Sequence, residues 1–359
     1  MRLAIVHDYL IQMGGAERVV AAMVEAFPDA PIYTSTTDWD RLLPEFRGKA
    51  IVNSWANRLP GIRNSFKKFL PVYPLAFRSL KPVDADVAWI SSSGFAKWIR
   101  VTRNTATICY CHTPPRFFWN TDNYLSLEVS NSILRRIAKS LLALLREWDF
   151  QCAQRVDQFV ANSRCVQERI WQHYGRASTV IHPPVNVDRF SATKDSGDYY
   201  LVLSRLIGYK RIDLAIETFN RLRERLVIIG NGPDKPRLEA LAGPTITFLG
   251  QVTDSEMKSY LEGCRALIFP GLEDFGIVAV EAQACGRPVI AFGAGGALET
   301  VIPEETGILF ETQTIESLAD AVRRSQKIRW CSQTIRRSAL RFSREIFLDK
   351  MRALLEAVG

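Results

Sequence analysis

The chain has 359 residues, of which 47% are hydrophobic and 23% are charged. This composition is typical of a globular protein and excludes a disordered, fibrous or collagen-like chain, and because single cores stop growing at about 250–300 residues, the length favours two domains. The formal net charge of +8 favours an anionic partner but does not choose among nucleic acid, anionic lipid and a phosphorylated substrate.

The apolar runs of the sequence are short. Only four apolar residues, Leu3 to Val6, precede His7, which is far short of the core of a signal peptide. No apolar run reaches the ~18 residues that would cross a bilayer. The seven cysteines have no metal-binding spacing, which favours reduced thiols and no metal site. We therefore expect a cytoplasmic protein.

Apolar, β-branched runs alternate with helical patterns along the chain, which predicts parallel sheets covered by helices. The predicted strands of the first half are Leu3–Val6, Val87–Ser91, Thr107–Cys111 and Gln158–Ala161. Those of the second half are Tyr200–Ser204, Leu226–Gly230, Ile246–Leu249, Ala266–Phe269 and Val289–Phe292. A proline pair and a polar stretch between Ile181 and Asp198 mark the boundary. We expect two doubly wound, Rossmann-like α/β domains, residues 1–185 and 186–335, facing a cleft.

Two features of the first half follow predicted strands. The pair Gly14-Gly15 lies between the first strand and an amphipathic helix from Ala16 to Phe27. It lacks the full G-x-G-x-x-G pattern, so a dinucleotide cofactor is poorly supported and a plain tight turn is the alternative. His112 ends the strand Thr107–Cys111 and begins a rigid aromatic loop. A lone histidine at such a position can be structural or can serve a ligand.

Two segments of the first half combine basic and apolar residues. The segment 58–81 holds six lysines and arginines and no acidic residue, interleaved with leucines and aromatic residues. The segment Ile133–Trp148 places Arg135, Arg136, Lys139 and Arg146 around a leucine-rich face. Such segments favour contact with an anionic membrane surface, and ordinary amphipathic helices packed on the core are the alternative. A nucleic acid is disfavoured because no nucleic-acid-binding motif accompanies these residues.

The second half carries cations and glycines in the loops after strands. Arg205 and Lys210 lie on one strand-to-helix loop, where a cation pair can clamp a diphosphate or remain solvated. Gly230 and Gly232 end the next strand, as glycines do where a ligand approaches the backbone or where the chain simply turns. Val252 follows the strand Ile246–Leu249.

The clearest pattern begins after the strand Ala266–Phe269. Glu273 lies on a loop, and a helical stretch from Ile277 to Ala284 follows, with Glu281 inside it. A helix start offers free N–H groups and partial positive charge to a phosphate, and carboxylates accept hydrogen bonds from sugar and ribose hydroxyls. The alternative is that Glu273 caps the helix and Glu281 is solvated.

The run Glu273-Asp274-Phe275-Gly276-Ile277-Val278, with Glu281 after seven intervening residues, resembles the signature of the family 4 retaining glycosyltransferases. The resemblance implies a GT-B fold, with the segment 336–359 forming a last helix that crosses back to the first domain. It implies that Glu273 contacts the donor sugar and that Glu281 binds the nucleotide ribose. The resemblance places other candidate residues at the donor or in the cleft: Arg205 and Lys210 at the pyrophosphate, Phe275 to Val278 at the sugar and phosphates, Val252 beside the nucleobase, and Gly14, Gly15 and His112 in the cleft.

The run Tyr110-Cys111-His112-Thr113-Pro114, followed by Arg116 and Trp119, resembles a subgroup that contains bacterial polysaccharide and O-antigen mannosyltransferases. This resemblance implies transfer of mannose from GDP-mannose to a glycan or polyprenyl-diphosphate-linked acceptor, with retention and with no metal. It gives Glu273 and His112 positioning and electrostatic roles rather than covalent ones. Two other hypotheses remain: a nucleotide-sugar epimerase or phosphorylase on the same fold, and a non-catalytic protein that binds a membrane surface.

Overall fold

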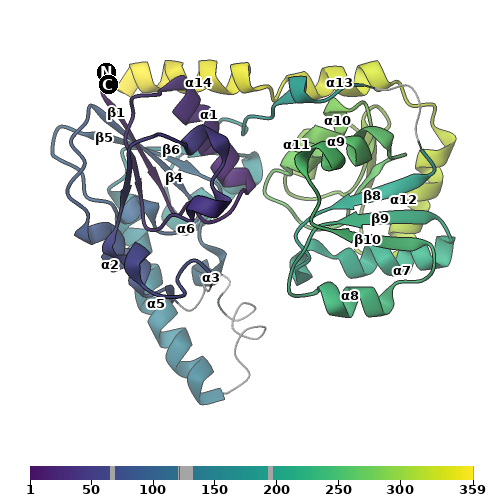
Figure 1. Ribbon diagram of the computed structural model, residues 1–359, viewed down its shortest axis with the longest axis horizontal. Helices are drawn as coiled ribbons and strands as arrows, with labels where there is room; N and C mark the ends of the chain where they lie inside the picture. The colour runs from purple at the N-terminus through teal and green to yellow at the C-terminus, as the bar shows by residue number, and fades with distance from the viewer. Residues whose placement is uncertain (65–68, 120, 122–131, 193–196, 359) are drawn as a thin grey trace. The chain divides into compact units, whose positions relative to one another are not determined.

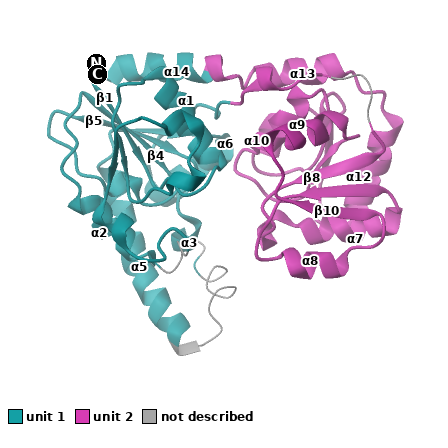
Figure 2. Cartoon of the chain, in the orientation of Figure 1, with its two compact units in different colours: residues 1–184, 347–359 teal, residues 185–346 magenta. Residues whose placement is uncertain are grey.

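The computed structural model describes residues 1–359 apart from 65–68, 120, 122–131, 193–196 and 359. The chain divides into two compact units, coloured separately in Figure 2. Unit 1 contains Met1–Pro184 and Phe347–Gly359, and unit 2 contains Val185–Ile346. In each unit a parallel sheet has apolar side chains on both faces, as expected when helices cover both sides. The predicted pair of doubly wound α/β units is confirmed.

The sheet described in unit 1 has the order β3-β2-β1-β4-β5-β6-β7, and its strands β1, β4, β5 and β6 are labelled in Figure 1. Its strands are β1 Leu3–His7, β2 Ile32–Thr34, β3 Ile51–Asn53, β4 Val87–Ser92, β5 Ala106–Cys111, β6 Gln158–Ala161 and β7 Ser178–Val180. The four strands predicted for this half are present, with ends that differ by no more than one residue. The three others, β2, β3 and β7, have only three residues each, too few to show a periodicity.

Six helices of the described chain cover this sheet: α1 Gly15–Ala26, α2 Val72–Ser79, α3 Arg116–Trp119, α5 Ser132–Gln154, α6 Arg164–Tyr174 and α14 Arg344–Val358. Successive residues of a strand point to opposite faces, so Ala4 and Val6 join one core cluster while Leu3 and Ile5 join the other. The last helix of the chain packs into the second of these clusters through Phe347, Leu348, Met351 and Leu355. The end of the chain therefore belongs to the first unit.

The sheet described in unit 2 has the order β10-β9-β8-β11-β12-β13. Its strands are β8 Tyr199–Leu203, β9 Arg225–Ile229, β10 Ile246–Gly250, β11 Leu267–Phe269, β12 Val289–Phe292 and β13 Gly307–Phe310. Its helices are α7 Ile212–Leu222, α8 Lys235–Leu241, α9 Asp254–Gly263, α10 Ile277–Ala284, α11 Ala297–Thr300, α12 Ile315–Lys327 and α13 Ser332–Leu340. The predicted helix from Ile277 to Ala284 is confirmed residue for residue.

Both sheets reverse their winding at one place. In unit 1 the chain winds outward from β1 to β3 and then returns to place β4 against the other side of β1. In unit 2 it winds from β8 to β10 and returns to place β11 against β8. At such a switch point the loops after the two central strands leave in opposite directions, and ligands bind there, beyond the carboxyl ends of the strands.

None of the described helices is long and apolar enough to cross a membrane. The segment 58–81, which is basic and apolar, includes residues 65–68, which lie outside the described chain. Most of its described apolar side chains are buried: Ile62, Leu70, Tyr73 and Phe77 belong to a core cluster of unit 1. These side chains therefore serve packing, which is the alternative that the sequence left open.

A buried ion pair joins the loop after β4 to two helices of unit 1. The ammonium of Lys97 lies 2.6 Å from a carboxylate oxygen of Asp149 on α5 and donates a hydrogen bond to the carbonyl of Gly94. The Tyr174 hydroxyl, on α6, donates to the other oxygen of Asp149 at 2.7 Å. Burial acts to lower the pKa of Lys97, but Asp149 outweighs this effect and the pKa is raised, so the lysine stays charged.

Replacing Asp149 by Asn should lower the free energy of unfolding by about 3–5 kcal/mol, because the Lys97 ammonium would remain buried without its counter-charge. Chemical denaturation measures this loss. Glu316→Gln is the matched control, since Glu316 pairs with Arg221 at the surface and such pairs contribute about 0–1 kcal/mol. If both variants lost the same small amount of unfolding free energy, the buried ion pair would not contribute to the stability of the fold.

Candidate active site

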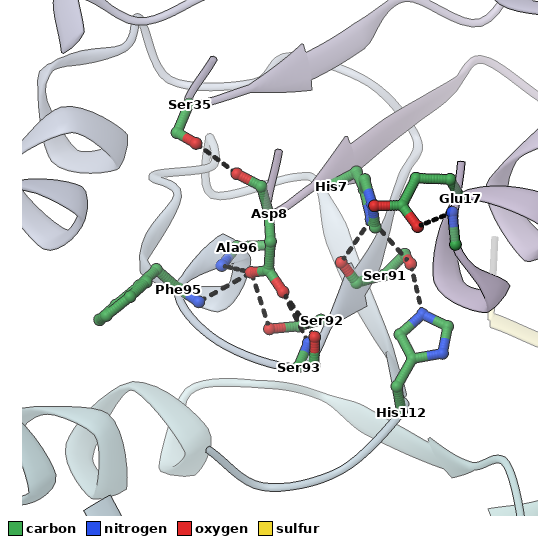
Figure 3. A network of polar contacts seen from close by, with 11 residues as sticks. His7, Asp8, Glu17, Ser35, Ser91, Ser92, Ser93, Phe95, Ala96 and His112 are labelled. Carbon is green, nitrogen blue, oxygen red and sulfur yellow. Dashed lines mark hydrogen bonds and ion pairs between the residues drawn. The ribbon is translucent and has the colours of Figure 1, made fainter. Parts of the chain in front are cut away.

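Three neighbouring strands of unit 1 bring a chain of polar side chains to their carboxyl ends (Figure 3). His7 ends β1, Ser91 lies near the end of β4, and His112 follows β5. The Ser91 hydroxyl is 3.0 Å from Nδ1 of His7 and 2.7 Å from Nε2 of His112. The hydroxyl therefore bridges two imidazole rings at the switch point of the sheet.

Asp8 organises the loop after β4. Its buried carboxylate accepts hydrogen bonds from the backbone N–H groups of Ser93 at 2.6 Å, Phe95 at 2.7 Å and Ala96 at 2.6 Å. These donors surround the start of a single 3-10 turn, η5, which spans Ala96–Trp98. Because a buried carboxylate needs such donors, Asp8 fixes the backbone that follows Ser91.

Glu17 connects the glycine turn to the same network. One of its oxygens accepts a hydrogen bond from the backbone N–H of Gly14 at 3.0 Å, and the other lies 3.9 Å from Nε2 of His7. A Cβ atom at Gly14 would lie 2.7 Å from the glutamate oxygen, so a side chain there would displace it. The predicted residue Gly14 thus begins α1 beside the histidines, and Gly15 is the exposed first residue of that helix.

His112 is a neutral imidazole held in a fixed orientation. Burial, together with the nearby His7, lowers the pKa of His112 to about 3. Its ring makes an edge contact with Tyr110 at 5.2 Å between centroids, and its carbonyl accepts a hydrogen bond from the Asn162 side chain at 2.9 Å. At physiological pH this ring can therefore donate one hydrogen bond and accept one.

In unit 2 the structure brings Lys210 and Glu273 together. The two side chains form a hydrogen-bonded ion pair and are both mostly buried. Lys210 ends the 3-10 turn η7, Gly208–Lys210, in the loop after β8, and Glu273 lies in the loop after β11. These are the two strands that flank the switch point of this sheet. Arg205 lies on the same loop as Lys210 and is exposed.

The two glycines after β9 support the loop that carries Arg205. The backbone N–H of Leu206 donates to the carbonyl of Asn231 at 3.0 Å. A Cβ atom at Gly230 would clash with the carbonyl oxygen of Ser204, and one at Gly232 would clash with that of Leu206. Glycine is therefore required at both positions by contact between two loops, a packing reason that the sequence did not reveal.

The start of α10 has the form expected of an anion site. Gly276 is the N-cap, in the left-handed region with a φ of 90°, and it makes no side-chain cap hydrogen bond. The helix then begins with Ile277 and Val278, which are half-buried. Phe275 is buried against Phe342, with ring centroids 5.2 Å apart. This packing holds the turn before the helix in place.

Two further predicted site residues of unit 2, Glu281 and Val252, have side chains that are not fully exposed. Glu281 is only 7% exposed within α10, which rules out the solvated helix residue considered as an alternative. Val252 follows β10 and packs against a core cluster of the unit. Among the described residues there is no group of three or more histidine, cysteine, aspartate or glutamate side chains that could hold a metal ion.

Sequence reasoning missed several residues of these sites. His7, Asp8, Glu17 and Ser91 were given no role, although polar residues at the carboxyl ends of predicted strands were a usable signal. In unit 2 the glycine-rich loop 293–296 after β12 was also missed. The Gly296 N–H donates to the carbonyl of Glu273 at 2.9 Å, so this loop supports the glutamate.

Comparisons with known proteins agree with this arrangement. A family model described as "Glycosyltransferase Family 4" matches residues 13–189, and one described as "Glycosyl transferases group 1" matches residues 185–335. The chain is 24% identical to "Alpha-1,3/1,6-mannosyltransferase ALG2" of Dictyostelium discoideum, over 89% of this chain and 88% of that protein. It is 29% identical to a "GDP-mannose-dependent alpha-(1-6)-phosphatidylinositol monomannoside mannosyltransferase" of Mycobacterium tuberculosis, over 55% of each chain.

Solved structures share the fold. Sucrose-phosphate synthase from Thermosynechococcus elongatus superposes with a TM-score of 0.75 at 19% identity, covering 100% of this chain and 99% of that one. HepE from Anabaena, in complex with UDP and glucose, superposes with a TM-score of 0.74 at 17% identity, covering 99% and 100%. The predicted GT-B fold is thereby confirmed.

Two parallel-sheet units with polar residues gathered at both switch points, in a chain that matches these family models, define a glycosyltransferase. The chain belongs to the family 4 glycosyltransferases.

Gly230→Ala should lower the free energy of unfolding by about 1–3 kcal/mol or more. The new methyl group would push the Ser204 carbonyl away, and the φ of Gly230 is favourable only for glycine. Thermal and chemical unfolding measure the loss. Gly208→Ala is the matched control in a neighbouring loop, where the nearest atom to an added Cβ is 3.8 Å away and φ is not positive. An equally stable Gly230→Ala variant would contradict the packing argument.

Proposed function

We propose that the chain transfers mannose from GDP-mannose to a glycan or polyprenyl-diphosphate-linked acceptor with retention at the anomeric carbon. The observation that carries the proposal is the buried contact of Lys210 with Glu273 at the switch point of unit 2, beside the start of α10. The choice of mannose is supported by relatives named as mannosyltransferases, and the choice of GDP by the relative named as GDP-mannose-dependent.

In this proposal the donor diphosphate binds at the start of α10, against the backbone of Gly276, Ile277 and Val278. The helix start contributes N–H groups and partial positive charge, and Arg205 and Lys210 contribute full charges. Lys210 then lies between the diphosphate and Glu273, so one cation orients both the leaving group and the carboxylate that receives the sugar hydroxyls. Glu281 binds the ribose, and Val252 lies beside the base.

Departure of the nucleoside diphosphate is the difficult step, because negative charge develops on the leaving phosphate. Fixed cations and backbone dipoles that already face this charge are the most effective help that a protein can give. Arg205 and Lys210 supply that charge in the proposed mechanism, which therefore requires no metal ion. The acceptor hydroxyl attacks from the face that the diphosphate leaves and gives its proton to the departing phosphate. Glu273 and His112 position the sugar without forming a covalent bond to it.

A thermal-shift panel of GDP, UDP and ADP with their mannose or glucose conjugates tests the donor, since a ligand that binds only the native state raises the melting temperature. We expect stabilisation by GDP and GDP-mannose. Lys210→Ala and Arg205→Ala should reduce the shift, whereas Glu273→Ala should mainly lower the transfer rate, by about 10²-fold or more. The matched control is Arg221→Ala, which removes a surface cation of unit 2 that pairs with Glu316.

Equal shifts with every nucleotide, or full transfer activity in all three site variants, would overturn the donor assignment. Incubation of the donor without an acceptor separates the epimerase hypothesis, because an epimerase converts the nucleotide sugar by itself and a transferase does not.

We also propose that the protein contacts an anionic membrane surface through α5. Five apolar side chains on this helix recur at spacings of three and four residues, which places them on one face. Their exposed fractions are 58% for Leu134, 61% for Ile137, 38% for Leu141, 50% for Leu144 and 37% for Trp148. Arg135, Arg136, Lys139 and Arg146 are exposed on the same helix. The first turns of α5 project from the rest of unit 1 in Figure 1.

An exposed apolar stripe on a basic helix fits the interface of a bilayer that carries negative charge. Co-sedimentation with phosphatidylcholine vesicles containing phosphatidylglycerol should therefore recover the protein, and raising the salt concentration should weaken the binding. The double variant Ile137→Glu, Leu144→Glu should reduce the partition coefficient at least tenfold, because burial of each such side chain contributes about 1.5–3 kcal/mol.

The matched control is Trp171→Glu, which changes an apolar residue of α6 that is 64% exposed and lies outside the stripe. Equal binding by the control and the double variant, or no binding to the charged vesicles, would refute the membrane proposal.

A further inference from the structure

We infer that Ser91 and His7 are positioning residues that fix the tautomer of His112, so that its ring carries the proton on Nδ1 and presents a hydrogen-bond donor to the substrate. The inference deepens the proposed function, since it rests on His112 lying in the substrate site. It concerns residues to which neither the sequence motifs nor the family resemblance assigned a role.

The first step is the proton on His7. Its Nδ1 atom lies 3.2 Å from the backbone carbonyl oxygen of Ser91 and 3.0 Å from the Ser91 hydroxyl oxygen. A carbonyl oxygen can only accept a hydrogen bond, so an unprotonated Nδ1 would face it lone pair to lone pair. We therefore assign a proton to Nδ1 of His7, because only then is the contact with the carbonyl a hydrogen bond, and His7 donates toward Ser91. Both residues are fully buried, so no solvent can replace this donor.

The second step is the proton of the Ser91 hydroxyl. Because the His7 ring donates toward Ser91, the hydroxyl has no acceptor on that ring. Its other ring neighbour is Nε2 of His112, at 2.7 Å, a normal length for a hydrogen bond. The hydroxyl therefore donates to His112, and Nε2 of His112 accepts.

The third step concerns the remaining nitrogen of His112. A neutral imidazole carries one proton, and the hydrogen bond made by one nitrogen decides where that proton lies. Burial and the neighbouring His7 lower the pKa of His112, which keeps the ring neutral. With Nε2 accepting, the proton must reside on Nδ1. Figure 3 shows Nε2 directed toward Ser91 and the other ring nitrogen pointing away from it.

The ring orientations that this argument requires are held from several sides. Glu17 lies at the opposite edge of the His7 ring, with one oxygen 3.9 Å from Nε2 and the other accepting from the N–H of Gly14. The contact with Nε2 is attractive when that nitrogen is protonated too, and Nδ1 then still donates to Ser91. A flipped His7 ring would lose both contacts with Ser91. The edge contact with Tyr110 fixes the ring of His112.

A fixed N–H donor has a defined ligand chemistry. It can bind a hydroxyl or phosphoryl oxygen of a nucleotide sugar, but it cannot accept a proton from an acceptor hydroxyl. The chain of Ser91 and His7 thus makes His112 a hydrogen-bond donor rather than a base, which agrees with a reaction in which the departing phosphate takes the proton of the acceptor hydroxyl. Neither Ser91 nor His7 touches the substrate in this arrangement.

The tautomer can be measured without substrate, which separates a failure of this inference from a failure of the proposed function. The chain has four histidines, so two-bond ¹H–¹⁵N correlation spectra of the ¹⁵N-histidine-labelled protein can be assigned with single His→Gln variants. We expect the Nδ1–H pattern for His112 in the unaltered protein and a shift of its population toward Nε2–H in Ser91→Ala. Ser91→Thr, which retains the hydroxyl, should keep the original pattern.

The matched control is Ser54→Ala. Ser54 is another buried serine of unit 1 that donates to a backbone carbonyl, that of Ser35 at 2.7 Å, but it contacts neither histidine. An Nε2–H pattern in the unaltered protein, or an unchanged pattern in Ser91→Ala, would overturn the inference.

Kinetics give a second readout that general loss of structure would not produce. Ser91→Ala should lower kcat by about 10- to 10²-fold, with little change in KM. The upper value is the effect expected when one hydrogen-bond donor to the transition state is lost. In a His112→Gln background the same substitution should cost nothing more, because the residue that it positions is already gone. If the decreases in kcat of the two single variants multiplied in the double variant, Ser91 would act independently of His112 and the positioning role would be refuted.

Discussion

The architecture of unit 1 depends on the satisfaction of buried charge at its switch point. Asp8 directly follows β1, and its carboxylate accepts hydrogen bonds from three backbone N–H groups of the loop after β4. A charged group therefore joins the ends of two strands that lie far apart in the sequence. An uncompensated carboxylate at this depth would cost several kcal/mol, and its partners are therefore confined to one loop conformation. That conformation directs Lys97 inward to Asp149, while the pairing of β4 with β1 and β5 places Ser91 between the two histidines.

The two units treat charge at their switch points in opposite ways. In unit 1 the carboxylates of Asp8 and Glu17 are buried, and the group in the candidate site, His112, is neutral. In unit 2 the cations Arg205 and Lys210 sit on a loop, one exposed and one mostly buried against a carboxylate. In the proposed function, the diphosphate of the donor needs cations that can be shared with it, whereas a sugar hydroxyl can be held by an uncharged hydrogen-bond donor such as His112.

The sequence predicted the fold class and most strands because apolar, β-branched runs that alternate with helical patterns reveal buried parallel strands. It did not predict β2, β3, β7 and β13, and the first three of these are too short to show a pattern. It predicted Lys210 and Glu273 from a family motif, and the structure joins them. It did not predict the partnership of His7 with Ser91, because that pairing depends on β4 returning beside β1, and strand order leaves no local trace in the sequence. The segments 58–81 and Ile133–Trp148 looked alike in composition, yet tertiary packing buries most described apolar side chains of the first and exposes a stripe of the second.

The Lys97 to Asp149 pair also connects the candidate site to α5. Lys97 belongs to the turn that Asp8 caps, while Asp149 follows directly after Trp148, the last residue of the exposed apolar stripe. The loop after β4, which Asp8 holds, and the helix that we propose contacts lipid are therefore joined by a buried ion pair. If α5 lies on a bilayer, this bond fixes the distance of His112 from the lipid surface. An acceptor carried by a lipid diphosphate would need such a fixed distance, because its reactive hydroxyl lies a set number of bonds from the membrane.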